Sequence, residues 1–398
     1  MTVQPSVDVG GLGLDGGAHL LVKLALRDAP TGVVAVHGWH PDLVGQLATW
    51  CRQEGHRLRV PPTGTGGPVA SVERGPSARS RWVGATRAGG VDDSVVDRPS
   101  ADWGLAARGA MVEAGGPTPA FALDDRDAVW TDRARRLYAQ AAAAQWDPDA
   151  AIDWAAPIAN AAPVEDAVVQ LMTFLIENEE AALVVPARFL GQVHPHFREI
   201  QQVLAVTVAD EARHIDVFTR RATLGGAALG LSTVGGRASL QTLLDEPDFA
   251  TASFLLSVMG EGTFVSLLGF LERHAPDPLT RRIAHLTRQD EARHVAFALG
   301  HLERHAELDP TVRPRLARAV ERRHAALRTT AGLNDEVFDA LVLLAAGATT
   351  PTAVAAGWQA VHDLQRDMDE SRRARLARLG FTPGETEELS ALHTRNFM

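Results

Sequence analysis

The chain has 398 residues, of which 45% are hydrophobic and 22% charged, as expected for a globular protein with a large buried core and two or three domains. Its formal net charge is −10 and it has no basic stripe or run of like charges, which argues against nucleic acid or a membrane surface as its main partner. Because we find no signal peptide, no apolar run approaching a membrane span and only one cysteine, Cys51, we expect a cytoplasmic protein without an internal disulfide.

Residues 1–60 alternate short apolar runs with Gly and Pro, which predicts a small α/β domain. Within it, residues 18–27 have helical periodicity and residues 33–36 form a Val-rich run typical of a strand. Residues 43–52 predict a second helix that ends before Gly55.

Residues 61–125 are rich in Gly, Pro, Ser and Asp and show little periodicity. This composition predicts a linker region, with one hairpin around residues 81–86. Beyond it the sequence becomes rich in Ala, Leu, Arg and Glu with helical spacing, so residues 126–398 are expected to form a mainly α-helical domain.

Prolines and glycines divide this helical region into candidate helices. Pro186 lies inside the first of them and predicts a kink or a π-type bulge there, because proline cannot donate its backbone hydrogen bond. The expected helices span residues 164–193, 197–224, 248–274, 278–305, 311–332, 334–347, 352–379 and 383–391.

The sequence DEARH occurs twice, at residues 210–214 and 290–294, each time well inside a candidate helix. The helix before each copy carries a glutamate, Glu180 or Glu261, that is followed nine and ten residues later by Phe-Leu. The separations from these glutamates to the DEARH glutamates are 31 residues (211 − 180) and 30 residues (291 − 261). The chain therefore contains two helix pairs of the same design, each with Glu on one helix and Glu-x-x-His on the next.

This spacing suits metal binding. Side chains three residues apart lie on one face of a helix, so the Glu and the His of each DEARH copy can reach the same ion. Four packed helices bring both faces and two single carboxylates around a shared centre. Carboxylates can bridge two cations and imidazole suits iron or manganese, whereas four buried carboxylates without cations would be very costly. A salt-bridging surface motif is the alternative, but two copies with matched upstream glutamates favour a buried site for two metal ions.

The ligand set and its order resemble those of the ferritin-like di-iron (or di-manganese) carboxylate superfamily over residues 160–310. The resemblance implies a ferritin-like four-helix bundle with additional helices, two iron ions (Fe/Mn or Mn being alternatives) and dioxygen as co-substrate. In this family the DEARH glutamates often bridge, and the preceding aspartate often bonds a ligand histidine of the opposite pair, which gives that role to Asp210 and Asp290. The six implied ligands are Glu180, Glu211, His214, Glu261, Glu291 and His294.

Three features leave alternatives open. Glu177 lies one turn before Glu180 and could replace it as a ligand. Gly260 and Gly262, which flank Glu261, each cost about 1 kcal/mol of helix stability relative to Ala, so they indicate either close helix packing or space for dioxygen or substrate. The remaining helical-region histidines are expected at the surface or at helix ends, namely His194, His196, His274, His285, His301 and His305.

The resemblance also limits the function. Tyr138, the only tyrosine, precedes the first bundle helix, which disfavours a tyrosyl-radical role, and the additional helices disfavour a storage ferritin. Arylamine-oxidising members carry an extra histidine where this chain has Thr207 and Thr287, which disfavours that subgroup. We therefore expect a di-iron oxidase or oxygenase that hydroxylates, desaturates or N-oxygenates a small organic substrate, with an electron donor and a homodimer as implied partners. The alternative is a ferroxidase or metal-binding protein without an organic substrate.

Residues 7–60 resemble the small sulfur-carrier family that includes TusA and SirA, through Asp8, Gly11-Leu12 and the helix after them. In that family a Cys-Pro-x-Pro motif carries the reactive thiol. Leu14 occupies the cysteine position here, and Asp15 and Gly17 replace the two prolines. The resemblance therefore implies a degenerate domain for docking or structure, and a partner in sulfur metabolism is a further alternative for the whole protein.

Overall fold

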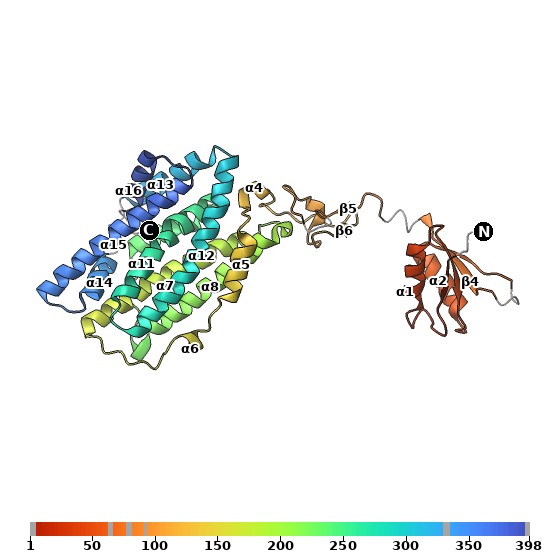
Figure 1. Ribbon diagram of the computed structural model, residues 1–398, viewed down its shortest axis with the longest axis horizontal. Helices are drawn as coiled ribbons and strands as arrows, with labels where there is room; N and C mark the ends of the chain where they lie inside the picture. The colour runs from red at the N-terminus through yellow and green to blue at the C-terminus, as the bar shows by residue number, and fades with distance from the viewer. Residues whose placement is uncertain (1–4, 63–66, 77–81, 91–93, 329–334, 395–398) are drawn as a thin grey trace. The chain divides into compact units, whose positions relative to one another are not determined.

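The computed structural model describes residues 5–62, 67–76, 82–90, 94–328 and 335–394. The chain forms two compact units (Figure 1), one made of residues 1–92 and 106–118 and the other of residues 93–105 and 119–398. The region expected to be a linker thus contributes residues to both units. Its first part even supplies a strand to the N-terminal sheet, because residues 70–73 alternate buried and half-buried side chains as a half-covered strand requires.

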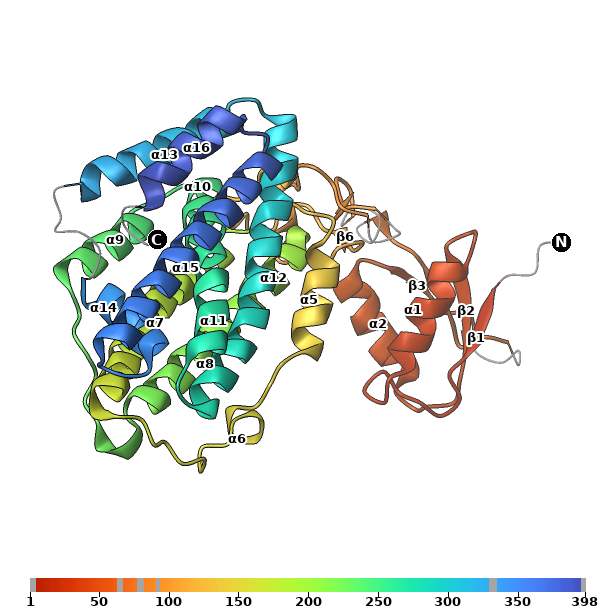
Figure 2. The ribbon, with the colours of Figure 1, turned by 60° about the vertical axis from the view of Figure 1, so that its left-hand side comes forward.

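The N-terminal unit is an α/β fold, as the sequence predicts. Its mixed sheet has the order β1-β2-β4-β3, in which β1 and β2 are parallel and the other neighbours are antiparallel. Both helices lie on one face of this sheet (Figures 1 and 2), where Val22, Leu47 and Val72 are fully buried. The elements are β1 (Ser6–Asp8), α1 (Ala18–Asp28), β2 (Val33–His37), α2 (Leu43–Glu54), β3 (Arg57–Arg59) and β4 (Ala70–Glu73).

A short ladder follows in the same unit. Strand β5 (Thr86–Arg87) pairs with β6 (Met111–Val112), so the partner of Thr86 lies 26 residues later (112 − 86) and not in a local hairpin. Arg81, the other end of the expected hairpin, lies outside the described residues.

The second unit is mainly α-helical and is built on a ferritin-like four-helix bundle. Its four long spans agree with the expected helices to within a few residues at each end. They are α7 (Ala162–Leu190), α8 (Arg198–Ala222), the composite α10 (Phe249–Ser253), η4 (Phe254–Glu261) and α11 (Gly262–His274), and α12 (Pro278–Leu308). Asp277 starts α12 in the way its sequence predicts, because its carboxylate accepts a hydrogen bond from the Thr280 amide (2.7 Å) and Pro278 occupies the first turn.

Additional helices surround the bundle. Figure 2 shows α15 alongside α11 and α12, while α14 packs on α7 and α5 packs on α8. Helices α13 and α16 pack against each other and cover one end of the bundle (Figure 2). These elements are η1 (Ala101–Trp103), α4 (Arg126–Val129), α5 (Ala134–Ala143), α6 (Pro148–Ala151), η2 (Pro195–Phe197), η3 (Leu224–Gly226), α9 (Val234–Leu244), α13 (Val312–Leu327), α14 (Asp335–Ala346), α15 (Pro351–Arg378) and α16 (Pro383–Thr394).

The irregular winding expected in the first bundle helix occurs in another helix. Helix α7 is α-helical through Pro186, whereas the π-helical segment η4 lies in the third span and ends at Glu261. A π-helix winds more slowly than an α-helix and shifts the direction of the side chains that follow it. The glycine-flanked glutamate is therefore the one whose orientation depends on irregular winding.

The third bundle span is more apolar than expected from the sequence. Phe249–His274 has the length and mean hydropathy (1.7) of a membrane-crossing helix, but 78% of that apolar window is buried inside the protein. Helices α14 and α15 reach the same criterion only together, across a bend of 117°. Burial around the bundle centre explains why the third span is apolar on all sides.

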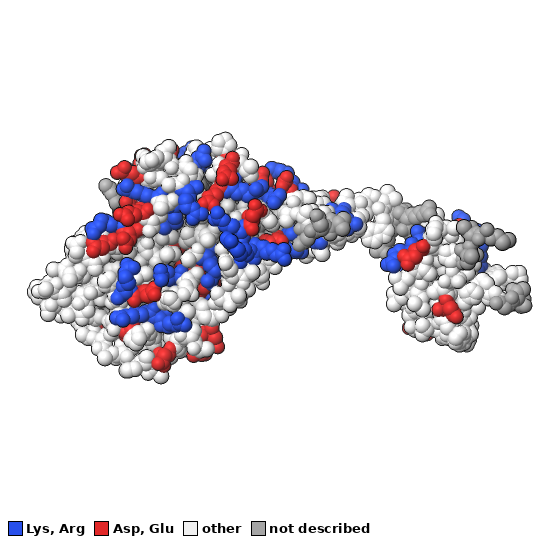
Figure 3. Space-filling view, viewed as in Figure 1, with Lys and Arg blue, Asp and Glu red and all other residues white. Residues whose placement is uncertain are grey.

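A buried ion network joins three bundle helices at one end. Arg221 of α8 is fully buried and donates to both carboxylate oxygens of Glu165 in α7 (2.6 and 2.9 Å) and to Asp277 before α12 (2.9 Å). On the protein surface, basic and acidic side chains of the helical unit are interspersed (Figure 3), as in the ion pair of Arg378 with Glu303 (2.6 Å).

Candidate metal centre

Two groups of buried carboxylates and histidines meet at the centre of the bundle. In each group, the candidate ligand atoms all lie within 4.8 Å of one another. Glu211 and Glu291 belong to both groups, which is the position that a ligand bridging two ions must occupy. The first group is Glu179, Glu211, His214 and Glu291, and the second is Glu211, Glu261, Glu291 and His294.

Helix geometry explains this convergence. Each DEARH copy lies in the middle of a long helix, and its Glu and His are three residues apart on the face turned to the bundle interior. Glu179 reaches the centre from α7, and Glu261 reaches it from the end of η4. All six side chains are at most 5% exposed, so the cluster is shielded from solvent.

Each histidine is oriented by an aspartate of the opposite helix pair. His214 Nε2 lies 3.1 Å from Asp290 Oδ2, and His294 Nε2 lies 3.3 Å from Asp210 Oδ2. This reciprocal arrangement confirms the prediction for the two aspartates. Because a carboxylate at Nε2 favours a proton on that nitrogen, the lone pair of Nδ1 is left to face the cluster.

The Nδ1 atoms do face the glutamates. His214 Nδ1 lies 3.0 Å from Glu211, 3.4 Å from Glu291 and 3.5 Å from Glu179. His294 Nδ1 lies 2.9 Å from Glu211 and 3.5 Å from Glu291. Lone pairs of nitrogen and oxygen that converge at these distances need a cation between them.

Two residues after α5 complete the shell around the aspartates. Gln145 donates to Asp210 (2.7 Å), and Trp146 Nε1 donates to Asp290 (2.9 Å) and stacks on the His214 ring. Arg213 donates to both aspartates (2.5 and 3.0 Å), so the two halves of the site share one guanidinium. Neither Gln145 nor Trp146 belongs to the repeat, and sequence reasoning had no signal with which to find them.

The protonation of the cluster also points to cations. Burial and the charges of Glu211 and Glu291 raise the pKa of Glu179 well above its ordinary value. Burial and the charge of Glu291 do the same to the pKa of Glu261. Burial alone would lower the pKa of His294, but the charge of Glu211 raises it well above the ordinary value. The cluster therefore holds protons unless metal ions replace them.

Buried polar atoms without hydrogen-bond partners test the fit of metal ions directly. Among the described residues, nothing hydrogen-bonds Glu211 Oε1, either oxygen of Glu261, Glu291 Oε2 or His294 Nδ1. Buried polar atoms are nearly always paired, so orphans gathered at one point call for a missing ligand. Carboxylate oxygens and imidazole nitrogens are the donors that iron and manganese accept, and the site could hold two such ions.

One expected ligand is wrong by a single residue. The side chain of Glu180 is exposed and Glu177 is half-buried, while the neighbouring Glu179 is 3% exposed and belongs to the cluster. The choice of Glu180 assumed equal distances to the Phe-Leu pairs, but Glu179 lies ten residues before Phe189 and Glu261 lies nine before Phe270 (189 − 179; 270 − 261). A shift of one position rotates a helical side chain by about 100°, which separates core from solvent.

One histidine expected at the surface or a helix end, His301, is instead fully buried inside α12. His194, His196 and His305 lie at helix ends, as expected, although they are at most 9% exposed. His301 lies 2.9 Å from Ser253 Oγ and packs on the Phe249 ring, and burial lowers its pKa to about 3. It is therefore an uncharged core residue and not a ligand of the metal centre. Only His274 and His285 are partly exposed, as expected.

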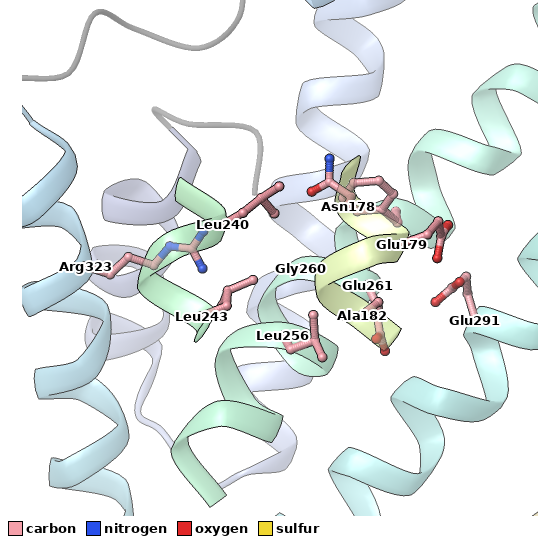
Figure 4. Close-up of a pocket in the computed structure, with 11 residues that line it drawn as sticks. Asn178, Glu179, Ala182, Leu240, Leu243, Leu256, Gly260, Glu261, Glu291 and Arg323 are labelled. Carbon is pink, nitrogen blue, oxygen red and sulfur yellow. The ribbon is translucent and has the colours of Figure 1, made fainter. Parts of the chain in front are cut away.

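Two pockets adjoin the cluster at Glu261, and each contains about 390 Å³ of space between atoms. Both are lined mainly by apolar side chains, and Leu256 and Glu261 line both of them. The first pocket also reaches Glu179 and Glu291 (Figure 4), and the second reaches His294. Thr207 also lines the second pocket.

The two glycines beside Glu261 have different surroundings, so each is explained differently. A Cβ on Gly262 would lie 2.4–2.8 Å from the Arg375 guanidinium, so Gly262 permits close packing of α15. Gly260 has no such neighbour, since its nearest contact would be the Leu255 carbonyl at 3.4 Å, and it lines the first pocket. Close packing and space beside the site therefore both occur, at one glycine each.

No family model matches the sequence, and no curated protein shows significant similarity to it. Among solved structures, the chain is similar to a protein with aldehyde deformylating oxidase activity from Synechococcus, at 20% identity and a TM-score of 0.42 over 60% of this chain and 98% of that one.

The chain is also similar to two variants of an R2-like ligand-binding oxidase with reconstituted Mn/Fe cofactors. One has 18% identity and a TM-score of 0.43 over 65% of this chain and 94% of that one, and the other has 15% and 0.44 over 63% and 94%. None of the comparisons supports the resemblance of residues 7–60 to sulfur carriers. Similarity of this extent does not establish a function, which depends on the residues of this site.

Proposed function

We propose that the protein is a di-iron oxidase or oxygenase that activates dioxygen and acts on a small organic substrate by hydroxylation, desaturation or N-oxygenation. The observation that carries the proposal is the pair of histidines whose Nε2 atoms are bound by Asp290 and Asp210 while their Nδ1 atoms face four buried glutamates. This is the arrangement of a carboxylate-rich site for two ions.

The chain supplies a defined role for each ligand. Glu179 and His214 would hold one ion, Glu261 and His294 the other, and Glu211 and Glu291 both. The bound iron pair would supply the electrons that reduce dioxygen. The protein residues exclude bulk water, keep a proton on each imidazole Nε2, which donates to an aspartate, and hold the glutamate carboxylates close together. Repeated oxygenation would also require an external electron donor.

The pockets favour an organic substrate over simple iron oxidation. A ferroxidase needs a route for iron, which polar side chains provide, whereas the space beside Glu261 is enclosed by residues such as Leu243, Leu256, Phe264 and Phe297. Small-molecule sites are mostly apolar with a few polar groups, as this lining is. Substrate would therefore lie next to Glu261.

For the N-terminal unit we propose docking or a structural role instead of persulfide transfer. Cys51 is buried in the core between α2 and the sheet, and burial raises its pKa to about 11. A thiol needs to ionise to act as a nucleophile, so Cys51 cannot stand in for the cysteine that Leu14 replaces.

The test is to load the protein anaerobically with ferrous iron and then to add dioxygen. We expect about two irons per chain, oxygen consumption and a transient optical change, all lost in Glu211→Ala and His294→Ala. Failure to bind iron, or binding unaffected by both substitutions, would overturn the proposal. Iron that is oxidised and accumulates beyond two per chain would identify a ferroxidase instead.

A further inference from the structure

A buried group of basic side chains includes Arg323, which lines the first pocket on the side away from the candidate ligands. Arg323 of α13 is 7% exposed, Arg375 of α15 is half-buried with its Nη2 atom buried, and His393 of α16 is 4% exposed. Arg323 and His393 come from the two helices that cover one end of the bundle, and Arg375 comes from α15, as does the neighbouring Arg372, which is 1% exposed.

Two of these arginines lack a compensating charge. Arg323 donates to the Oγ (2.6 Å) and carbonyl of Ser239, and Arg375 donates to the Val258 carbonyl (2.8 Å). Among the described residues, no carboxylate lies within ion-pair distance of either guanidinium. Arg323 Nη1, Arg375 Nη2 and His393 Nε2 are buried and accept or donate no hydrogen bond there. Burying a charge without a partner is costly, so an anion is expected at this point.

The pKa values of these basic side chains agree with the lack of a carboxylate partner. Burial lowers the pKa of Arg323 to about 10 and, with the charge of Arg372, that of Arg375 to about 9. Burial and the positive charges of Arg372, Arg323 and Arg375 hold the pKa of His393 well below its ordinary value. Burial alone accounts for the shift at Arg323, while nearby positive charges add to the shifts at Arg375 and His393; a bound anion would oppose all three.

The position of Arg323 links this group to the metal centre. Arg323 lines the same pocket as Glu179, Glu261 and Glu291. Figure 4 shows its side chain on one side of the pocket and the carboxylates of Glu179 and Glu291 on the other. The wall between them is apolar and includes Leu240, Leu243, Leu256 and Phe264. A molecule that fills this pocket would have one polar end at Arg323 and an apolar body beside Glu261.

We infer that the substrate is an apolar carboxylic acid, whose carboxylate binds Arg323 and whose hydrocarbon part extends along the pocket to Glu261. A guanidinium and a carboxylate form two parallel hydrogen bonds, and the orphaned Nη1 of Arg323 supplies one of these donors. The negative carboxylate would also supply the counter-charge that these buried arginines lack. This inference rests on the proposed function for the reaction, but not for the binding of the acid.

The test uses equilibrium dialysis of the full chain with octanoate and with octan-1-ol, which has the same hydrocarbon length but no charge. We expect octanoate to bind at about one per chain and at least about tenfold more tightly than the alcohol, since hydrogen bonds to charged groups are stronger. Arg323→Met should weaken octanoate binding by about tenfold or more, and Arg323→Lys should restore part of it. Arg318→Met, at an exposed position of the same helix, should leave binding unchanged.

Circular dichroism of each variant controls for folding. If Arg323→Met does not fold, Ser239→Ala removes the hydroxyl that positions Arg323 and should weaken octanoate binding several-fold. Equal binding of acid and alcohol, or binding unaffected by loss of Arg323 or Ser239 Oγ, would overturn the inference. A shortened chain without residues 395–398, which lie outside the described residues, shows whether the chain supplies the anion itself. Octanoate binding that appears only in the shortened chain would also overturn it.

Measuring octanoate binding beside iron uptake and oxygen consumption separates this inference from the proposed function. Glu211→Ala should abolish oxygen consumption by iron-loaded protein while octanoate binding persists, because Glu211 does not line the first pocket. If the protein binds octanoate through Arg323 but takes up no iron, the anion site stands and the di-iron proposal fails. If it takes up iron and consumes oxygen without binding octanoate, the reverse holds.

Discussion

His214 of α8 and Asp290 of α12 are joined across the bundle, with His214 Nε2 3.1 Å from Asp290 Oδ2. The aspartate also accepts from Trp146 and pairs with Arg213 and Arg293. These interactions hold the pKa of Asp290 below its ordinary range against the opposing effect of its burial, with the bond to His214 as the first lowering cause. Asp290 therefore remains ionised and fixes both the ring orientation and the protonated nitrogen of His214.

We expect Asp290→Asn to weaken metal binding by about 10–100-fold without unfolding the protein, because outer residues of metal sites typically have effects of this size. The amide has the shape of the carboxylate but no longer favours a proton on Nε2. Titration with Mn²⁺, followed by equilibrium dialysis, measures the change. Asp216→Asn, at a half-exposed site on α8, is the control and should bind Mn²⁺ as the unaltered protein does. Equal affinities for Asp290→Asn and the control would contradict the role given to Asp290.

Glu179 and Glu180 form a matched pair for testing the register of α7. Glu179 is buried in the first ligand group and Glu180 is exposed. Glu179→Ala should reduce bound metal from about two ions per chain to one or fewer, whereas Glu180→Ala should leave it unchanged. Metal analysis after dialysis measures both. Loss of metal in Glu180→Ala alone would mean that α7 is rotated by one residue relative to this structure.

Gly260 and Gly262 should respond differently to alanine. The added Cβ at Gly262 meets the Arg375 guanidinium and displaces the hydrogen bond to Val258, so we expect a destabilisation of about 1–3 kcal/mol. At Gly260 the added methyl meets only ordinary contacts, so Gly260→Ala should be neutral or stabilising by up to about 1 kcal/mol. Urea unfolding of both variants gives the comparison. Equal losses of unfolding free energy in the two variants would contradict the open space described at Gly260 and the close contact described at Gly262.

Arg221→Met should destabilise the helical unit by about 3–5 kcal/mol, because it leaves Asp277 buried without its cation. The long apolar stem of Met keeps most of the packing. Arg220→Met removes a partly exposed ion pair with Asp149 next to it and should cost less than about 1 kcal/mol. Urea unfolding at neutral pH measures both variants, and a similar small loss in each would contradict the structural role of the network.

The same network predicts a pH dependence. Burial alone would raise the pKa of Asp277, but the Thr280 amide and Arg221 lower it below the ordinary value. An acid with a lowered pKa in the folded state stabilises the protein above its unfolded pKa of about 3.9, and that contribution is lost as pH falls through the folded value. Stability of the unaltered protein should therefore drop below about pH 4, and this part of the drop should be smaller in Arg221→Met, which keeps the Thr280 bond but loses the positive charge.

Several features could be predicted from the sequence because they depend on neighbours along one helix. The spacing of Glu211 with His214, and of Glu291 with His294, is determined by the 3.6-residue period, as are the long helices that carry them. The duplicated DEARH placed Asp210 and Asp290 correctly, since each copy repeats the same geometry.

Other features depended on contacts between segments far apart in the chain. Glu179 rather than Glu180 faces the centre because the packing of α7 on α8 sets its rotation, and Gln145, Trp146 and the Arg323 group reach their sites from helices outside the repeat. The π-helical winding before Glu261 likewise accompanies the packing of Arg375 against Gly262. The sequence by itself therefore determined which residue types could hold metals, because local periodicity places them on one face. Only the tertiary structure decided which of two adjacent glutamates is buried, what supports the histidines and which apolar pockets adjoin Glu261, because those depend on how separate helices pack.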